Sequence, residues 1–452
     1  MRRLFGTAGI RGVFNRDLDS NLTLKVALAV SKDDERGRVA VARDGRFGSQ
    51  AMKYVLESGF LSSGWDVLDV GVCPTPILAF ATKEYDCNYG VMMTASHNPP
   101  EYVGMKIFDG DGMEIPEEKE VEIQRRTEEG DLPRGMWSRI GRSIQGEGAE
   151  QHYIKKLLEE LPEEGKRSLN ILVDCSNGPV TTPISSILSN LGHRILLYNS
   201  HCDGCFPGRR PEPTPKNLEK TARLVRDLGL DLGIAFDGDG DRVSLIDERG
   251  RFISVHTVAA TYVKRRLEEQ FNKKVVVSID TSRAVEEVVN QAGGEVFWSR
   301  LGKTFVRVKD LGGAIGSEPW KIVDVDWGLW EDGLFEAAKI VSWMSQTSLK
   351  ASEFFGQVPE YPQVRWSRST ESRLEAEETM RKIVEKMRPK AQRVITIDGV
   401  KMEFDERTWL LVRTSGTENK IRVYVEAETE EKLSKITEEL SQLNNGKVGW
   451  ET

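Results

Sequence analysis

The sequence of 452 residues lacks long apolar runs, and none approaches the roughly 18 residues that a membrane-spanning helix needs. It also lacks low-complexity tracts, and its basic start at residues 2–3 is not followed by the apolar core of a secretory signal. These absences predict a cytoplasmic protein with no membrane partner. The hydrophobic content of 39% and the charged content of 30% are typical of globular chains. The length favours about three or four domains.

An excess of positive charge is also absent. The chain has 63 Lys and Arg residues against 71 Asp and Glu residues, which gives a net charge of −8. This balance excludes a general nucleic-acid binder, because such proteins present a strongly basic surface. An anionic substrate would have to be held by basic groups gathered in one place.

Cysteine is scarce, with 5 residues in the whole chain. An odd number of cysteines and no secretory signal predict reduced thiols. Cys202 and Cys205 form a C-x-x-C pair beside His201, but the chain has no second pair. A zinc or redox role and an ordinary loop both stay open for these two thiols.

Short apolar runs alternate with longer amphipathic stretches, and each run leads into a polar loop. This alternation is typical of α/β units, in which ligands gather at the loops beyond the strand ends. We expect strands at residues 39–42, 89–93, 171–173, 232–236 and 312–316, leading into loops 43–46, 94–100, 174–178, 237–242 and 317–320. Helices are expected at residues 22–30, 51–62, 218–228, 258–271 and 284–291.

The end of the chain has a different pattern. A helix is predicted at residues 371–387 and another at 430–443, with three strands at 393–397, 409–412 and 421–425 between them. This order predicts an α+β domain. A polar, glycine-rich linker is expected at residues 130–150, with further breaks near Gly250 and Pro362. The predicted domains are therefore residues 1–148, 149–250, 251–362 and 363–452.

Three aspartates, Asp237, Asp239 and Asp241, alternate with glycines after an apolar run. In an extended chain they would share one face and repel one another unless a cation joined them. Hard oxygen ligands of this kind suit Mg²⁺. An EF-hand loop is disfavoured, because its sixth position needs glycine and holds Arg242 here. A solvated acidic turn and an aspartyl-phosphate enzyme remain alternatives. A second acidic pair, Asp109 and Asp111, is predicted to form a hairpin turn between strands 105–108 and 113–115.

Ser96 offers a hydroxyl in the run Thr-Ala-Ser-His-Asn-Pro-Pro at residues 94–100. The two prolines restrict the loop and remove backbone donors. A serine needs a base or prior phosphorylation to transfer a group, and His97 is adjacent. A hydroxyl that carries phosphate and three carboxylates that hold a cation together suggest phosphoryl transfer. An ordinary turn is the alternative for this motif taken alone.

A third motif, Arg-Thr-Ser-Gly-Thr at residues 413–417, follows a predicted strand. Its guanidinium, hydroxyls and glycine are the components of a phosphate cradle, and Arg422 on the next strand adds a second guanidinium. An ordinary hairpin with surface arginines is the alternative.

These motifs together resemble the α-D-phosphohexomutase family. The resemblance runs from Leu-Phe-Gly-Thr-Ala-Gly-Ile-Arg-Gly at residues 4–12 to Arg-Thr-Ser-Gly-Thr-Glu-Asn-Lys-Ile-Arg at residues 413–422. It implies an enzyme of four domains round a central cleft, with three similar α/β domains and a C-terminal α+β domain that binds phosphate. It also implies a cytoplasmic phosphoprotein that acts on a hexose phosphate, with Mg²⁺ and a sugar 1,6-bisphosphate intermediate, and it leaves a homodimer open.

The resemblance also implies a role for each site residue. Ser96 is the expected phosphoserine, and it binds the metal together with Asp237, Asp239 and Asp241. Transfer is assisted by His97, Lys106, Arg11 and Arg242. The expected ligands of the substrate phosphate are Arg413, Ser415, Gly416, Thr417 and Arg422.

The sugar loop departs from the family pattern. The family reads Gly-Glu-x-Ser-Gly-His, whereas residues 316–321 read Gly-Ser-Glu-Pro-Trp-Lys. Glu318 is expected to accept hydrogen bonds from the sugar, and Trp320 either stacks on the sugar ring or packs internally. We favour conversion of glucosamine 6-phosphate to glucosamine 1-phosphate, with glucose and mannose phosphates as alternatives. A binding protein without activity is the remote alternative.

Overall fold

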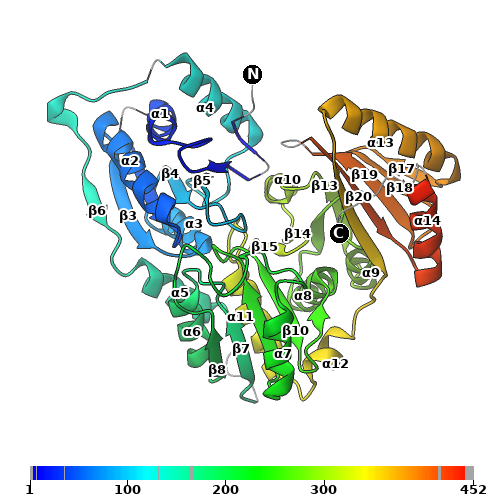
Figure 1. Cartoon of the computed structure of the whole chain (residues 1–452). Helices are drawn as coiled ribbons and strands as arrows, with labels where there is room; N and C mark the ends of the chain where they lie inside the picture. Colours follow the sequence, from blue (N-terminus) through cyan, green and yellow to red (C-terminus); the bar gives the residue numbers. More distant parts are fainter. Residues whose placement is uncertain are drawn as a thin grey trace. The chain divides into compact units, whose positions relative to one another are not determined.

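The computed structural model describes residues 4–6, 8–34, 36–130, 132–161, 167–415 and 419–442, and Figure 1 shows the whole chain. The chain forms two compact units. One comprises Met1–Val258 with Trp320–Gln357, and the other comprises Ala259–Pro319 with Val358–Thr452. Over the described part of the chain, no helix has the length and apolar character to cross a membrane.

The first unit begins with a mixed sheet in the order β1-β5-β4-β2-β3-β6. Strand β2 pairs in parallel with β3 and β4, whereas β4 pairs antiparallel with β5. Helices α1, α2 and α4 share one hydrophobic core with these strands (Figure 1). The bounds are β1 Ile10–Val13, α1 Ser20–Val30, β2 Arg38–Arg43, α2 Phe47–Ser63, β3 Asp66–Val72, α3 Thr75–Glu84, β4 Tyr89–Met93, β5 Tyr102–Asp109, α4 Glu117–Glu129 and β6 Ser143–Gln145.

Helix boundaries in this sheet have local causes. Asp19 caps α1 by accepting a hydrogen bond from the backbone N–H of Leu22 at 2.8 Å. Helix α2 ends at Gly64, whose φ of +96° lies in the left-handed region that glycine adopts at little cost. Both helices begin before the predicted starts, because their first residues, 20–21 and 47–50, lie outside the apolar periodicity that predicts the helix.

A second sheet in the same unit has the order β11-β10-β9-β7-β8. Its central strand β7 pairs in parallel with β8 and β9, and β9 pairs antiparallel with β10. The bounds are α5 Ala149–Glu159, β7 Asn170–Asp174, α6 Thr181–Asn190, β8 Arg194–Tyr198, α7 Glu219–Asp227, β9 Leu232–Phe236, β10 Val243–Asp247, β11 Phe252–Ile253, α11 Gly333–Ser345 and α12 Ala351–Phe355. Outside this sheet, helix α8 spans Val255–Glu269 and strand β15 spans Lys321–Asp324.

The second unit contains a third set of parallel strands, the third parallel set, in which β12 pairs with β13 and β14. The three sheets therefore share one pattern: a central strand, β2, β7 or β12, lies between two parallel neighbours. The candidate serine and aspartate loops follow the equivalent strands β4 and β9, and Glu318 ends β14. The bounds are β12 Lys274–Ser278, α9 Arg283–Gln291, β13 Glu295–Ser299, α10 Thr304–Leu311 and β14 Ile315–Glu318.

The last sheet is antiparallel throughout, in the order β16-β20-β19-β18-β17. Helices α13 and α14 cover one face of it (Figure 1) and bury Leu410, Val412 and Val423 there. The predicted C-terminal α+β arrangement is thus confirmed. The bounds are β16 Gln363–Ser369, α13 Arg373–Met387, β17 Arg393–Ile395, β18 Val400–Glu403, β19 Trp409–Thr414, β20 Lys420–Glu426 and α14 Glu430–Gln442.

Two local predictions were wrong. The expected linker at residues 130–150 contains β6, whose backbone pairs with residues 67–69 of β3. Its side chains are all exposed, so no apolar alternation could signal the strand. The second strand of the hairpin at Asp109 is reduced to a single bridge between Phe108 and Glu114.

The face of the last sheet that lies away from α13 and α14 packs on the third parallel set. Trp409, Leu411 and Tyr424 form a cluster there with Ile279 and Trp298. Lys401 lies within this contact and is fully buried. Its Nζ lies 3.9 Å from the ring centre of Trp298 and 4.1 Å from that of Trp409, and it donates to the carbonyl of Ile279 at 3.0 Å.

We expect Lys401 to make stability depend on pH. Burial lowers the pKa of Lys401 to about 8 from its ordinary 10.5. Between these two pKa values the unfolded chain binds the extra proton, so raising the pH favours the folded state. The free energy of unfolding, measured in urea, should rise by about 3 kcal/mol more in the wild type than in Lys401→Met across this interval.

The exposed residue Lys435, whose Nζ contacts Glu431 at 2.6 Å, supplies a control for that measurement. Lys435→Met should leave the pH dependence as it is in the wild type. An identical slope in the wild type and Lys401→Met would show that Lys401 does not titrate in this interval.

Candidate functional site

Ser96 lies in the loop between β4 and β5 and is completely buried. Its φ of +50° is left-handed, which costs a non-glycine residue about 1–2 kcal/mol. The Oγ donates to Asp237 Oδ2 at 2.8 Å and lies 3.3 Å from Nδ1 of His97. The folded chain thus brings the serine and the aspartate loop into direct contact across 141 residues of sequence.

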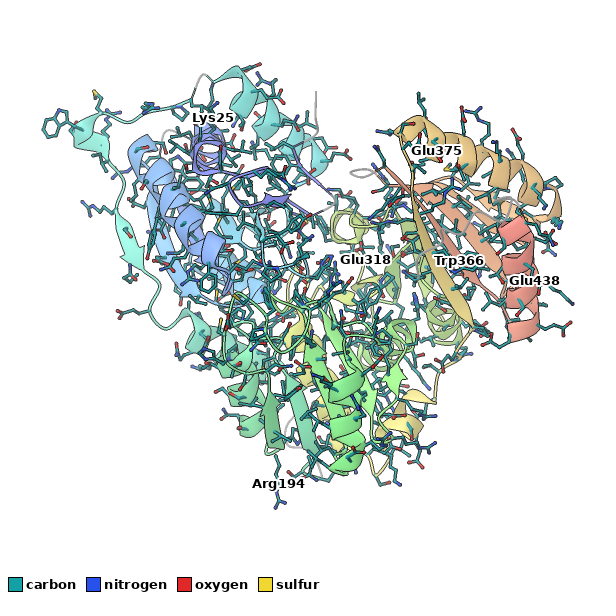
Figure 2. The ribbon with its side chains drawn as sticks, in the orientation of Figure 1. Lys25, Arg194, Glu318, Trp366, Glu375 and Glu438 are labelled. Atoms are coloured by element: carbon teal, nitrogen blue, oxygen red, sulfur yellow. The ribbon has the colours of Figure 1, made fainter. Side chains whose placement is uncertain are left out.

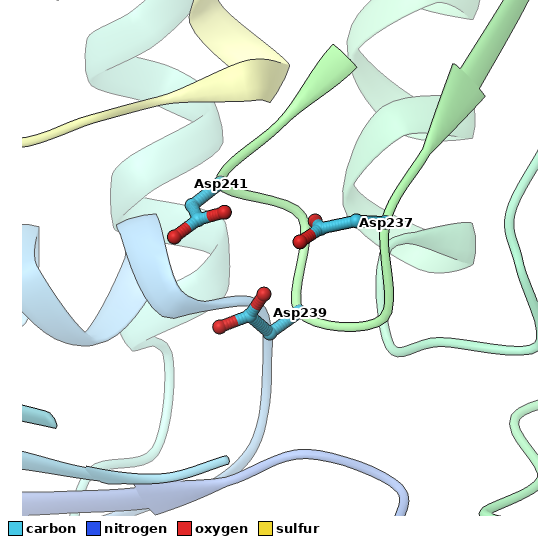
Figure 3. A group of neighbouring side chains, drawn as sticks. All are labelled: Asp237, Asp239 and Asp241. Atoms are coloured by element: carbon cyan, nitrogen blue, oxygen red, sulfur yellow. The ribbon is translucent and has the colours of Figure 1, made fainter. Parts of the chain in front are cut away.

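The three aspartates lie in the loop between β9 and β10. Asp237 and Asp239 are completely buried, and Asp241 is 1% exposed. Figure 3 shows their carboxylates turned toward one another, and one oxygen from each lies within 4.8 Å of the others. A solvated acidic turn is therefore wrong, because water does not reach these groups. The flanking segments are strands, which is also incompatible with an EF-hand.

Basic side chains surround this acidic group. Lys106 on β5 contacts Asp239 at 3.1 Å and also pairs with Asp241. Lys321 on β15 lies 3.3 Å from Asp241, and Nε of Arg242 lies 4.0 Å from it. Burial opposes the ionised form of Asp241, but Lys106, Lys321 and Arg242 hold its pKa well below the ordinary value.

The described oxygen atoms fit a divalent cation. Asp239 Oδ1 and Asp241 Oδ1 are buried and accept no hydrogen bond from the described residues. Burial and the charges of Asp239 and Asp241 raise the pKa of Asp237 well above its ordinary value. A cation bound between the carboxylates would relieve this repulsion and use the unpartnered oxygens. The group can therefore hold Mg²⁺.

His97 and Arg11 lie beside the serine. Burial and the neighbouring charges of Arg242 and Arg11 lower the pKa of His97 well below its ordinary value, so its imidazole is neutral at pH 7. Arg11 on β1 donates to Asn98 Oδ1 at 3.2 Å. Its Nε is buried and donates no hydrogen bond to any described residue.

Glu318 and Trp320 flank the point at which the chain passes between its two units. Glu318 at the end of β14 (Figure 2) accepts from Thr304 Oγ1 at 2.8 Å and from the N–H of Gly302 at 2.9 Å. Trp320 has a φ of +67°, and its Nε1 is buried with no acceptor among the described residues. Sugar binding by these two residues stays a prediction.

Arg413 and Arg422 are direct cross-strand partners on β19 and β20. Like charges placed directly opposite each other on one face are destabilising unless anions lie between or beside them. Asp398 contacts Arg413 at 3.1 Å. The backbone N–H of Ser415 donates to the carbonyl of Lys420 at 2.8 Å. The other two predicted phosphate ligands, Gly416 and Thr417, lie outside the described residues.

Two site residues were missed. Lys321 lies in the altered sugar loop of the sequence, yet it contacts Asp241 and also pairs with Glu331. Thr75 at the start of α3 donates its hydroxyl to Asp239 at 2.7 Å. No spacing signals either contact, because each partner comes from a separate α/β repeat or a later segment. Cys202 and Cys205 are free thiols, and within the described residues neither belongs to a metal-ligating group.

Comparison with protein families accounts for nearly the whole chain. Family models of phosphoglucomutase/phosphomannomutase match in order: alpha/beta/alpha domain I at residues 2–134, domain II at 151–250, domain III at 254–361 and the C-terminal domain at 370–443. The chain belongs to the phosphoglucomutase/phosphomannomutase family. It is therefore a sugar-phosphate mutase with the four-domain architecture of that family.

Curated relatives of the family cover almost the full length. A "Probable phosphoglucosamine mutase" of Methanopyrus kandleri is 39% identical, with 97% of each chain covered. A phosphopentomutase of Thermococcus kodakarensis is 36% identical, with 96% of each chain covered. A phosphoglucomutase/phosphomannomutase of the same organism is 35% identical, with 97% of each covered. The relatives thus differ in the sugar that their names give.

Solved structures of the family share the fold. A phosphoglucomutase/phosphomannomutase family protein of Burkholderia thailandensis superposes with a TM-score of 0.87 at 23% identity, covering 98% of this chain and 97% of the other. An N-acetylphosphoglucosamine mutase of Aspergillus fumigatus, solved with GlcNAc-6P and magnesium, gives 0.62 at 15% identity, covering 98% and 95%.

We expect Lys106→Met to destabilise the protein, because the buried aspartates then lack a compensating charge. Without the ammonium, Asp239 and Asp241 lose their closest positive charge. The free energy of unfolding, measured in the presence of a chelator, should therefore fall by about 3–5 kcal/mol. Mg²⁺ should restore more stability in the variant than in the wild type, because the cation no longer competes with Lys106. Thermal unfolding with and without Mg²⁺ measures both effects.

Lys53→Met is the matched control for this experiment. Lys53 is also buried and paired with two carboxylates, at 2.6 Å from Glu57 and 2.7 Å from Asp69, but it contacts no aspartate of the loop. The Lys53→Met variant should be less stable than the wild type, but its gain in stability on adding Mg²⁺ should equal that of the wild type. An equal Mg²⁺ response in both variants would contradict the role given to Lys106.

Proposed function

We propose that the chain interconverts the 1-phosphate and 6-phosphate of a hexose through a phosphate carried on Ser96. The observation that carries this proposal is the contact of Ser96 Oγ with Asp237, 2.8 Å, inside a group of three buried carboxylates. A serine that transfers phosphate needs a neutralising cation at that place. An aspartyl-phosphate mechanism would assign no role to the buried Ser96, although its hydroxyl contacts Asp237.

Each transfer exchanges one phosphorus–oxygen bond for another. The free sugar hydroxyl attacks phosphorus, the bond to Ser96 Oγ breaks, and the proton of the hydroxyl finally resides on Oγ. His97, neutral and 3.3 Å from Oγ, is the group suited to relay that proton. The bisphosphorylated sugar then turns over, and its other phosphate returns to Ser96.

Charge stabilisation is the main contribution of a protein to phosphoryl transfer. Mg²⁺ held by Asp237, Asp239, Asp241 and the serine phosphate would neutralise the transferring group. Lys106 and Arg242, which contact the acidic group, would hold the phosphate oxygens together with Arg11, which contacts Asn98. Arg413, Ser415, Gly416, Thr417 and Arg422 would bind the non-reacting phosphate, and the cross-strand placement of Arg413 opposite Arg422 supports this role.

Glucosamine phosphate is the substrate we favour, because several curated relatives over the whole length are named for it. The phosphopentomutase relative makes a pentose phosphate a second candidate. Glu318 and Trp320 would contact the sugar, and Trp320 and Lys321 occupy the positions at which the family has a small Ser-Gly pair. We further propose a cytoplasmic enzyme and the four domains 1–148, 149–250, 251–362 and 363–452; a homodimer stays open.

We expect ³¹P NMR to detect interconversion directly. The protein is given Mg²⁺, a trace of sugar bisphosphate and one substrate at a time: glucosamine 6-phosphate, glucose 1-phosphate, mannose 1-phosphate or ribose 1-phosphate. Exchange between the two positional signals should be fastest for glucosamine phosphate. Faster exchange with ribose 1-phosphate would move the assignment to a pentose, and none with any sugar would contradict the proposal.

Ser96→Ala should abolish turnover while sugar-phosphate binding, measured by calorimetry, changes by less than about threefold. The reason is that the hydroxyl accepts the phosphate but supplies little binding energy. Wild-type protein treated with sugar bisphosphate should gain the mass of one phosphate, stable in acid, and the variant should not. Residual turnover in Ser96→Ala would contradict the phosphoserine role.

A further inference from the structure

Each of the three parallel sets ends its central strand with a buried aspartate that pairs with an arginine. Asp44 follows β2, Asp174 ends β7 and Asp280 follows β12, and none is more than 1% exposed. Their partners are Arg46 at 3.0 Å, Arg209 at 2.8 Å and Arg365 at 3.1 Å. The arginines come from three different places in the sequence, so this repeated pair is a property of the fold.

Arg46 uses all of its N–H groups. Nε donates to Asp44, and the two terminal nitrogens donate to four carbonyls of the serine loop. The side chain is completely buried. The acceptors are the carbonyls of Ser96 at 2.8 Å, Asn98 at 2.6 Å, Pro99 at 2.6 Å and Tyr102 at 3.2 Å.

Two further groups complete the arrangement around Ser96. The backbone N–H of Ser96 donates to Thr94 Oγ1 at 2.9 Å, and that hydroxyl donates to Asp44 at 2.8 Å. The ring of Phe206 lies 4.7 Å from the guanidinium of Arg46. The peptide groups on both sides of Ser96 are therefore tied to the same ion pair, which holds the residue at its positive φ.

Arg209 stands in the same relation to the aspartate loop. Its terminal nitrogens donate to the carbonyl of Phe236 at 2.6 Å and to that of Pro211 at 3.2 Å. Phe236 immediately precedes Asp237. Asp174 is held in turn by the hydroxyl of Thr221 at 2.6 Å and the amide of Asn199 at 3.0 Å.

We propose that Arg46 is the positioning residue for Ser96 and Arg209 the positioning residue for the aspartate loop. Neither touches substrate; each fixes the backbone from which a reacting or ligating side chain projects. This inference rests on the proposed phosphoryl transfer at Ser96. A displacement of about 1 Å in a reacting group is enough to cost about 100-fold in rate.

The decisive variant is Arg46→Lys. A lysine keeps the charge but presents its donors from one atom, so it cannot span Asp44 and four carbonyls. We expect kcat and the single-turnover transfer of phosphate from labelled Ser96 to sugar to fall about 100-fold. The Kd of the sugar phosphate and the Mn²⁺ affinity of the unphosphorylated protein should change by less than about threefold.

Arg209→Lys should change metal binding, which Arg46→Lys leaves nearly unchanged. Because the backbone before Asp237 is released, Mn²⁺ affinity, measured by electron paramagnetic resonance, should weaken about tenfold or more. This readout needs no turnover. Mn²⁺ affinity equal to that of the wild type would overturn the role of Arg209.

Lys53→Met controls for stability, because it removes a buried ion pair from the same sheet without touching the serine loop. The two variants are compared at an equal fall in Tm. If the rate of phosphate transfer falls no more in Arg46→Lys than in Lys53→Met, Arg46 only stabilises the fold, and the proposal is overturned. If Arg46→Lys does not fold, Thr94→Val replaces it. That change removes the hydroxyl between Asp44 and Ser96, and about a tenfold loss of transfer is expected; wild-type transfer would overturn the proposal.

Measurements on the wild type and on Arg46→Lys distinguish the mutase activity from the positioning role of Arg46. A wild-type protein that neither accepts phosphate on Ser96 nor converts a sugar phosphate would refute the mutase assignment. A wild type that does both, with an Arg46→Lys variant that transfers at the wild-type rate, would refute only the positioning role.

Discussion

Three carboxylates buried in one short loop are the constraint on which the rest of this structure depends. Asp237, Asp239 and Asp241 repel one another, and burial removes the water that would screen them. Lys106 from one sheet and Lys321 from a later segment supply the compensating charge. Lys106 on β5 and the aspartates after β9 therefore join the two α/β sheets of the first unit through buried ion pairs.

Repetition of one α/β pattern explains how such a site is assembled. The equivalent strands β4, β9 and β14 end at the serine loop, the aspartate loop and Glu318, so the same position in each repeat carries a different polar group. The buried aspartate after each central strand adds a local support, most completely at Asp44 and Arg46. The support is polar and fully hydrogen-bonded, which makes it geometrically specific in a way that apolar packing is not.

The C-terminal domain solves a different problem. One face of its sheet is covered by helices, and the other packs on the third repeat through Trp409, Trp298 and the buried Lys401. The opposed arginines Arg413 and Arg422 stand at the end of the same sheet, where two like charges are tolerated only beside anions.

The sequence by itself determined the α/β pattern of most of the chain and the α+β pattern of its end. Apolar runs that end in polar loops predicted the strands, and the spacing of Asp237, Asp239 and Asp241 predicted the cation site, because ligands on one short loop need no tertiary information. It did not predict β6, whose side chains are all exposed, nor the strands β16 and β18 of the last sheet. Only the tertiary structure decided that Lys321 and Thr75 reach the aspartates of the loop and that Arg365 reaches Asp280 from 85 residues away. Such contacts depend on how separate repeats meet, and no local periodicity records that.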